Sequence, residues 1–295
     1  MPEGNEVHRW ARRHTAAFAG KKLHVEGPNG RFKDAEILDG RRLERVIAIG
    51  KHLGYDFGPD RILHVHLGRY GDWTEGQMPL PEVRGMLRLR MWRIGASPVR
   101  QAAVPAKRHG WYSSDDGAST LDPAKVDWLE LRGPTDCSVY TQAKWQQLLD
   151  RLGPDPLHGH TPDHAIAKIR KTRKPIGVLL MEQDIMSGIG NIYRAELLFR
   201  ARLSPFVPGS DVPEATLRSI WKEARPLLEA GMTDRRIVTT LPRHRPHRTL
   251  QPPLKEEVHY VYRRNGKPCW ICGNPVNKQD MAGRSLYWCP SCQPA

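Results

Sequence analysis

The 295-residue sequence predicts an α+β protein with three parts: an N-terminal helix with a β-sandwich domain, a helical domain, and a small C-terminal module that contains four cysteines. Three observations predict this organisation. A helical apolar stripe opens the chain, short apolar segments separated by Gly, Pro and Asp follow it, and helical periodicity returns in the second half. We place the three domains at 1–140, 141–254 and 255–295.

The first domain combines one helix with a set of strands. Apolar side chains recur at helical spacing within 4–18, and Pro2 suits the start of a first turn, so a helix is expected to begin near Glu3. The segments "RVIAIG", "RILHVHLG" and "MLRLRMWRI" predict antiparallel strands between 23 and 139. Residues 95–127 show neither period and are expected to form a loop or an insertion.

The second domain is expected to be helical. Apolar stripes predict four helices, at 163–172, 175–184, 191–201 and 213–230. The Pro-, Arg- and His-rich stretch "RRIVTTLPRHRPHRTLQPPLKEE" then predicts a linker to the cysteine-bearing module.

The charge and hydropathy of the chain restrict its partners and its location. Lys and Arg total 46 against 32 Asp and Glu, and the resulting charge of +14 favours a polyanion such as nucleic acid or an anionic membrane surface. The longest apolar run, "IGVLLM", has six residues, far fewer than the roughly 18 that a membrane span needs. The basic first twenty residues lack the apolar stretch of an export signal. We therefore expect a soluble, cytoplasmic monomer.

Four of the five cysteines form two pairs near the C-terminus. Cys269 and Cys272 are separated by two residues, as are Cys289 and Cys292, and 16 residues lie between the pairs. This spacing predicts one four-thiolate zinc site with no open position, so the zinc is structural. The module serves either as a stability clip or as a contact surface; Arg284, between the pairs, would project toward a phosphate in the second case.

The stretch "MSGIGNIYRAELLF" contains closely spaced glycines before a predicted helix. A helical segment precedes it, whereas a dinucleotide-binding loop follows a strand, so a helix-turn-helix is the better interpretation. Gly188 and Gly190 would let the backbone approach a ligand, and Asn191 with the free amides at the helix start would favour one phosphate. The alternative is that Asn191 only caps the helix, and the two roles are compatible.

The N-terminus "MPEGNE" could take part in catalysis if Met1 is removed, because Pro2 would then carry a secondary amine. An α-amino group titrates near pH 8 and a lysine near about 10.4, so a terminal amine is the better nucleophile at neutral pH. Such an amine can attack a sugar C1′ to form an iminium that permits elimination at the neighbouring carbon. Glu3 would serve as acid and base, and Glu6, three residues later on the same helix face, would assist. The alternative is that these residues only start a helix.

Seven stretches resemble the formamidopyrimidine-DNA glycosylase and endonuclease VIII family, in the family's order and nearly from end to end. They are "PEGNE", "GKHL", "HVHLGRYG", "GPTDC", "GPDPL", "SGIGNIYRAELLF" and the final "CWIC…GRSLYWCPSC". The resemblance implies a two-lobed DNA-repair enzyme with a helix-two-turns-helix domain and a zinc hairpin. Such an enzyme flips a damaged base out of duplex DNA, cuts its glycosidic bond and nicks the abasic site.

The resemblance also implies a role for each matching residue. Pro2 matches the Schiff-base nucleophile and Glu3 the general acid. Lys51 matches the lysine of β-elimination and phosphate contact, Asn191 the DNA-binding asparagine, and Arg284 the zinc-hairpin arginine of δ-elimination. The four cysteines match the zinc ligands.

The chain resembles the endonuclease VIII branch most, which prefers oxidised pyrimidines. It opens with "MPEG", and "LRGPTDC" stands where the other branch has an arginine-bearing loop. In the loop that fills the space of a flipped base, Arg69 replaces a methionine and Tyr70 follows it, so Tyr70 is expected to stack on a base and Arg69 to hydrogen-bond one.

Two other classes of function remain open from the sequence. A damaged-DNA-binding protein without catalysis would have the same basic charge, Asn191 and zinc module. A zinc-ribbon protein that binds a protein partner would have no DNA affinity, and therefore none of the steep salt dependence that phosphate contacts produce.

Overall fold

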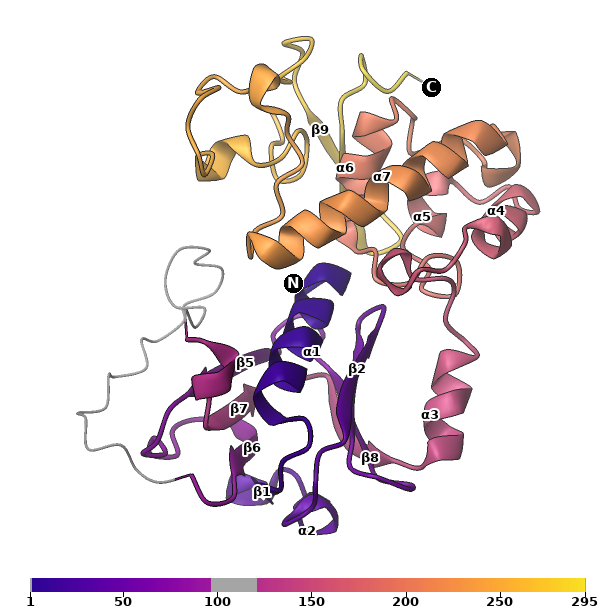
Figure 1. Cartoon of the computed structure of the whole chain (residues 1–295). Coiled ribbons are helices and arrows are strands. Elements are labelled where there is room, and N and C mark those ends of the chain that lie inside the picture. The colour runs from indigo at the N-terminus through magenta and orange to yellow at the C-terminus, as the bar shows by residue number, and fades with distance from the viewer. Residues whose placement is uncertain (1, 97–120, 295) are drawn as a thin grey trace. The chain divides into compact units, whose positions relative to one another are not determined.

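The structure, a computed structural model, describes residues 2–96 and 121–294. Most of the predicted loop at 95–127 lies outside the described residues. The chain divides into two compact units, Met1–Pro2 with Glu6–Asp150, and Glu3–Asn5 with Arg151–Ala295 (Figure 1). The three-domain division drawn from the sequence stays a prediction.

The first unit contains two antiparallel sheets of four strands each. In chain order the strands are β1 (Leu23–Glu26), β2 (Arg45–Ile49), β3 (His52–Asp56), β4 (Ile62–His66), β5 (Asp72–Gly76), β6 (Leu87–Arg93), β7 (Trp128–Arg132) and β8 (Asp136–Tyr140). One sheet has the order β1-β6-β7-β5 and the other β2-β3-β4-β8. The predicted antiparallel β-sandwich is confirmed.

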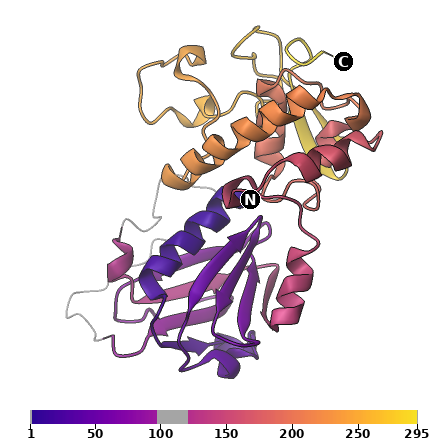
Figure 2. The same ribbon diagram turned by 45° about the vertical axis from the view of Figure 1, so that its right-hand side comes forward.

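Helix α1 (Gly4–Phe18) begins and ends where its apolar stripe predicts. Within the first unit α1 lies alongside the strands (Figure 2). Its buried side chains, among them Val7, Trp10 and Phe18, pack in one core with residues of both sheets. Cys137 packs against this core, and burial raises the pKa of its thiol to about 12, so it is an unreactive core residue as expected. Helix α3 (Gln142–Leu149) ends this unit.

The second unit is helical, with α4 (Asp163–Arg170), α5 (Ile176–Leu179), α6 (Asn191–Arg200) and α7 (Glu214–Thr233). Three of the four predicted helices are confirmed, but the prediction of a helix over 175–184 is wrong beyond its first turn. The backbone N–H groups of Met181, Glu182 and Ile185 bond to carbonyls three residues back. The side-chain amide of Gln183 donates to the carbonyls of Met181 and Ile189. These bonds fold the chain into tight turns that lead to α6.

Helix α6 is buried on nearly all sides because it separates two hydrophobic clusters. Leu197 and Leu198 belong to the cluster formed by the helices, whereas Ala195 and Phe199 pack with the cysteine-bearing segment. The buried carboxylate of Glu196 accepts hydrogen bonds from the backbone N–H groups of Tyr260, Val261 and Tyr262, at 2.8–2.9 Å. The C-terminal segment is therefore attached firmly to α6. It ends in the hairpin of β9 (Asn277–Met281) and β10 (Arg284–Trp288).

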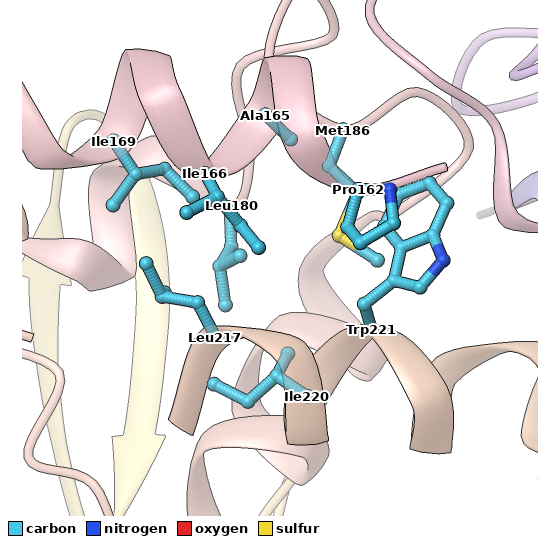
Figure 3. Close-up of a pocket in the computed structure, with 9 residues that line it drawn as sticks. All are labelled: Pro162, Ala165, Ile166, Ile169, Leu180, Met186, Leu217, Ile220 and Trp221. Atoms are coloured by element: carbon cyan, nitrogen blue, oxygen red, sulfur yellow. The ribbon is translucent and has the colours of Figure 1, made fainter. Parts of the chain in front are cut away.

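Figure 3 shows a pocket between α4 and α7, into which Ile166, Leu217 and Trp221 project. Its nine lining residues are apolar, so it offers no convergent polar groups to orient a nucleobase. We interpret it as a packing gap in the helical core. No helix in the described part of the chain is long and apolar enough to cross a membrane.

Candidate active site

Glu3 lies at the N-terminus of α6, although 187 residues separate it from Gly190 in the chain. Its buried carboxylate accepts three backbone hydrogen bonds: from Gly190 at 2.9 Å, Ile192 at 2.8 Å and Tyr193 at 3.3 Å. Three amide donors and the positive end of the helix dipole stabilise a negative charge at this point. The amides of Gly190, Ile192 and Tyr193 thus bind a carboxylate of the chain itself, so the prediction that these amides bind a phosphate is wrong. A contact between the Asn191 side chain and a DNA phosphate stays a prediction.

The two glycines of "SGIGN" make this approach possible. A Cβ at Gly190 would lie 2.4 Å from Cδ of Glu3, and a Cβ at Gly4 would lie 2.9 Å from Cα of Gly188. The N–H of Gly4 donates to the carbonyl of Gly188 at 2.8 Å. The backbone of this turn therefore approaches the N-terminal segment of the chain closely, and this contact fixes Glu3, the residue that follows Pro2.

Replacing Gly190 with alanine is expected to displace the Glu3 carboxylate. The overpacking should lower the free energy of unfolding by about 1–3 kcal/mol. Base removal, the activity that the resemblance implies, should fall at least about tenfold because Glu3 leaves its position. Thermal denaturation and an assay of base release measure the two effects. Gly159→Ala is a matched control: its Cβ meets nothing within 4 Å, while its φ of +77° strains an alanine. Loss of stability in both variants with full activity in Gly190→Ala would contradict the role of Glu3.

Asn191 is the first residue of α6, and Gly190 occupies the N-cap position, so Asn191 is not the helix cap. Its Nδ2 donates to the carbonyl of Ser285 at 2.9 Å, and its Oδ1 accepts a hydrogen bond from Arg194. Arg194 is itself buried and donates to the carbonyls of Gly177 and Ser285, at 3.2 and 3.3 Å. Both side chains thus hold strand β10 at the residue next to Arg284.

The charges of Arg194, Glu3 and Arg284 interact near the N-terminus of α6. Burial lowers the pKa of Arg194 to about 10, the Glu3 carboxylate acts in the opposite direction, and Arg284 lowers it further. At neutral pH Arg194 remains a cation near both Glu3 and Arg284. The sequence analysis missed Arg194, because an arginine inside a helical stripe looks like an exposed side chain.

Arg284 begins strand β10 and is exposed. The two residues before it, Ala282 and Gly283, have φ values of 52° and 69°, and the N–H of Gly283 donates to Oδ1 of Asp280 at 3.1 Å. Two left-handed residues make a tight two-residue hairpin turn. Arg284 therefore projects next to the tip of a short, well-defined hairpin.

The four cysteines of the C-terminal module converge on one point. Their Sγ atoms all lie within 4.8 Å of one another, with 3.9 Å between Cys269 and Cys292 and 3.5 Å between Cys272 and Cys289. Zn–S bonds of about 2.3 Å in a tetrahedron require sulfur separations of roughly 3.8 Å. The arrangement fits one four-coordinate zinc ion that has no vacant position for a substrate.

Lys51 lies in the first unit, in the two-residue turn Gly50–Lys51 between β2 and β3. The φ of Gly50 is +55°, which is common in a tight hairpin turn. Arg69 and Tyr70 follow β4 and are exposed, and the Arg69 guanidinium lies 5.4 Å from the centre of the Tyr70 ring. A cation and an aromatic ring at an exposed turn suit contacts with a nucleobase.

Pro2 and Glu6 are the remaining predicted site residues. Pro2 is half-buried and directly precedes Glu3. The carboxylate of Glu6 is bound by the guanidinium of Arg9, one turn later on α1, with 3.0 Å between Nε and Oε2. This ion pair orients the Glu6 carboxylate toward Arg9. The observed partner of Glu6 is therefore a side chain of its own helix.

A group of histidines was missed by the sequence analysis. His52, His64 and Asp136 lie on neighbouring strands of the second sheet and are joined by hydrogen bonds. The signal was present in "GKHL" and "HVHLG", where residues at alternate positions of a strand share a face. The group could not be predicted because Asp136 lies far from these two stretches in the sequence.

Comparison with known protein families covers most of the chain. The model of the formamidopyrimidine-DNA glycosylase N-terminal domain matches residues 1–92, that of the formamidopyrimidine-DNA glycosylase H2TH domain matches 152–241, and that of the zinc finger found in FPG and IleRS matches 266–295. Together with the converging sulfurs, the last match establishes one structural zinc.

Individual relatives align over the whole chain. Endonuclease 8 1 of Mycobacterium tuberculosis is 38% identical over 299 residues, which cover 99% of this chain and 100% of the relative. Formamidopyrimidine-DNA glycosylase of Thermus thermophilus is 28% identical over 298 residues, with 99% and 98% covered. The crystal structure of the MutM (Fpg) protein from Thermus thermophilus has a TM-score of 0.71, at 27% identity, and covers 99% of this chain and 98% of that one.

Proposed function

Because the chain belongs to the formamidopyrimidine-DNA glycosylase and endonuclease 8 family and is a DNA glycosylase of base excision repair, we propose that it also nicks the abasic site, through a Schiff base at Pro2. One observation carries this proposal: the carboxylate of Glu3 is fixed by three amides of α6. The residue next to Pro2 is thus rigid and charged, as an acid–base group beside a nucleophile must be.

In the proposed reaction the lone pair of the Pro2 nitrogen forms a bond to C1′ of the damaged nucleotide. The glycosidic bond breaks, and the base leaves with its electron pair and takes up a proton from water. The carboxylate of Glu3 accepts the proton of the attacking nitrogen. As the acid, Glu3 then gives this proton to O4′ while the C1′–O4′ bond breaks, and the nitrogen lone pair forms the C=N bond of an iminium.

Strand cleavage then proceeds by two eliminations. Loss of a proton from C2′ of the iminium expels the 3′ phosphate, and a second elimination expels the 5′ phosphate. We assign the first step to Lys51 and the second to Arg284, each of which can also stabilise a departing phosphate. Arg69 and Tyr70 would fill the space of the flipped base, and Asn191 would contact the DNA backbone near the hairpin that it holds.

We propose oxidised pyrimidines in duplex DNA, and abasic sites, as the substrates of a monomeric, cytoplasmic enzyme. The identity to a relative named endonuclease 8 1 supports this branch of the family. The net charge of +14 supports binding to a polyanion, so affinity for DNA should fall steeply as salt concentration rises.

A catalytically inactive protein that binds damaged DNA is the alternative function. Borohydride reduction distinguishes the two, because it converts an iminium into a stable protein–DNA adduct. An adduct on duplexes with an oxidised pyrimidine supports the enzyme. Absence of any adduct with several lesions, in protein confirmed to lack Met1, supports the inactive binder.

Replacing Lys51 with alanine should impair strand cleavage more than base removal or folding. Lys51 lies in a turn that Gly50 shapes, so its side chain is not needed for the hairpin. We expect nicking of abasic DNA to fall roughly 100-fold, a typical contribution of one general acid–base group, at an unchanged melting temperature. Lys125→Ala removes the same charge from an exposed position of the same unit and is the control. Equal nicking by both variants would remove Lys51 from the mechanism.

A further inference from the structure

Three histidines and one carboxylate gather on one sheet of the first unit, and the proposed reaction uses none of them. His52 lies on β3, His64 and His66 on β4, and Asp136 on β8. The strand register places His52 opposite His66, and His66 opposite Asp136. The rings of His52 and His64 stack at 5.2 Å, and those of His52 and His66 approach to 4.9 Å.

The carboxylate end of this group sets the direction of its hydrogen bonds. Oδ1 of Asp136 accepts from the hydroxyl of Ser138 at 2.9 Å, and Oδ2 accepts from Tyr140 at 3.1 Å. Burial alone would raise the pKa of Asp136, but the hydrogen bonds from Ser138 and His64 hold it below its ordinary value. An ionised carboxylate can only accept, so Nδ1 of His64, 2.8 Å from Oδ2, is the donor.

The tautomer of His64 then fixes that of His52. Burial lowers the pKa of His64, against the opposing effect of Asp136, so the ring is neutral near pH 7. A neutral imidazole that donates from Nδ1 accepts at Nε2. Nδ1 of His52 lies 3.0 Å from this nitrogen and must donate to it. The hydrogen bonds therefore run in one direction, from His52 through His64 to Asp136.

This series of hydrogen bonds begins beside Lys51. His52 follows Lys51 in the chain and is the first residue of β3, opposite Ile49 across the Gly50–Lys51 turn. The pKa of His66 is lowered by burial, then by His64 and by the charge of Lys51, so the Lys51 ammonium is near enough to this group to act on its charge. On the other side, the ammonium of Lys144 lies 3.9 Å from the centre of the Tyr140 ring.

We propose that His52, His64 and Asp136 form a hydrogen-bonded relay that positions Lys51 for strand cleavage, an inference that rests on the proposed lyase activity. The fixed tautomer orients the His52 ring and, through it, the turn that carries Lys51. These three are positioning residues, since they act through Lys51 rather than on the DNA.

The relay gives strand cleavage a defined dependence on pH. The pKa values of His64 and His66 lie below the ordinary 6.5, so these two histidines are neutral above that pH and gain charge below it. Protonation adds positive charge beside Lys51 and makes both nitrogens of a ring donors, which breaks the series of hydrogen bonds. Cleavage should therefore fall as the pH drops below the ordinary pKa of histidine. In Asp136→Asn the imidazolium loses its anionic partner, so this fall should move about 1 unit lower.

The test is single-turnover cleavage of a duplex that already contains an abasic site, by the full chain, from about pH 5 to about pH 9. Asp136→Asn and His64→Gln are expected to lower the cleavage rate at neutral pH roughly tenfold to 100-fold, at unchanged affinity for the duplex and unchanged melting temperature. His24→Gln is the matched control. His24 lies on strand β1 of the other sheet and forms an exposed pair with Asp39, at 3.2 Å, which the substitution removes.

Nitrogen-15 NMR of the wild-type histidines tests the relay without any substitution, and should show the Nδ1–H tautomer for His52 and His64. Nε2–H tautomers would overturn the inference, as would folded variants with the wild-type rate and pH profile. Abasic DNA left intact by the wild type would refute the proposed lyase activity itself. That result is distinct from an active wild type whose Asp136→Asn variant is unaffected.

Discussion

Pro2→Gly is expected to abolish the borohydride-trapped adduct with DNA and to lower base removal at least about 1,000-fold. The proposed reaction forms its only covalent bond to the protein at the Pro2 nitrogen. Glycine replaces this cyclic secondary amine with an unconstrained primary amine, so both chemical steps should be impaired. Glu3 remains at the N-terminus of α6, since its carboxylate is held by backbone amides and not by the proline ring. The melting temperature should therefore stay close to that of the wild type.

Two further variants complete this experiment. Glu3→Gln keeps the size of the side chain but removes its charge, so base removal should fall while an abasic duplex still forms some adduct. Glu6→Gln affects an ion pair with Arg9 on one helix and should retain most activity. A full yield of adduct in Pro2→Gly, attached at a residue other than residue 2, would exclude Pro2 as the nucleophile.

Cys269→Ser is expected to release zinc, unfold the C-terminal module and weaken DNA binding. Structural zinc contributes on the order of 10 kcal/mol to the folding of such modules, and a module this small cannot form a sufficient core alone. Cys269, Cys289 and Cys292 also pack with Phe199 and Tyr260, so the loss should extend to the C-terminal end of α6. The hairpin with Arg284 would lose its support, and the second elimination should be lost with it.

The fifth cysteine provides the control for zinc loss. Cys137 packs against the core of the first unit, whereas the four zinc ligands belong to the second unit, so Cys137→Ala should retain one zinc per chain and normal DNA affinity. Metal analysis and a DNA-binding titration measure the two quantities. Full affinity in a zinc-free Cys269→Ser chain would contradict the role assigned to the module.

Local patterns in the sequence predicted several helices and strands and the metal site. The apolar stripe over 4–18 predicted α1, the alternating segments predicted β2, β4 and β6, and the spacing of the cysteines predicted the metal site. Each of these signals arises from residues close together in the chain, where period and spacing report directly on geometry. The short α5 was overestimated because its apolar stripe continues into turns that Gln183 stabilises.

Contacts between distant parts of the chain could not be predicted. The glycines before α6 correctly indicated an anion, but only the structure shows that this anion is Glu3, which lies 187 residues away. In the same way, His64 and Asp136 are 72 residues apart and meet only because β4 pairs with β8. Pairing of distant strands depends on the whole fold, so a single sequence carries no local signal for it.

The attachment point of the trapped DNA tests the central claim most directly. Active protein is reduced with borohydride on an abasic duplex and digested, and the modified peptide is identified by mass spectrometry. The account predicts a chain that lacks Met1 and carries the sugar remnant on the nitrogen of Pro2. A remnant on Lys51, or an active chain that retains Met1, would contradict it.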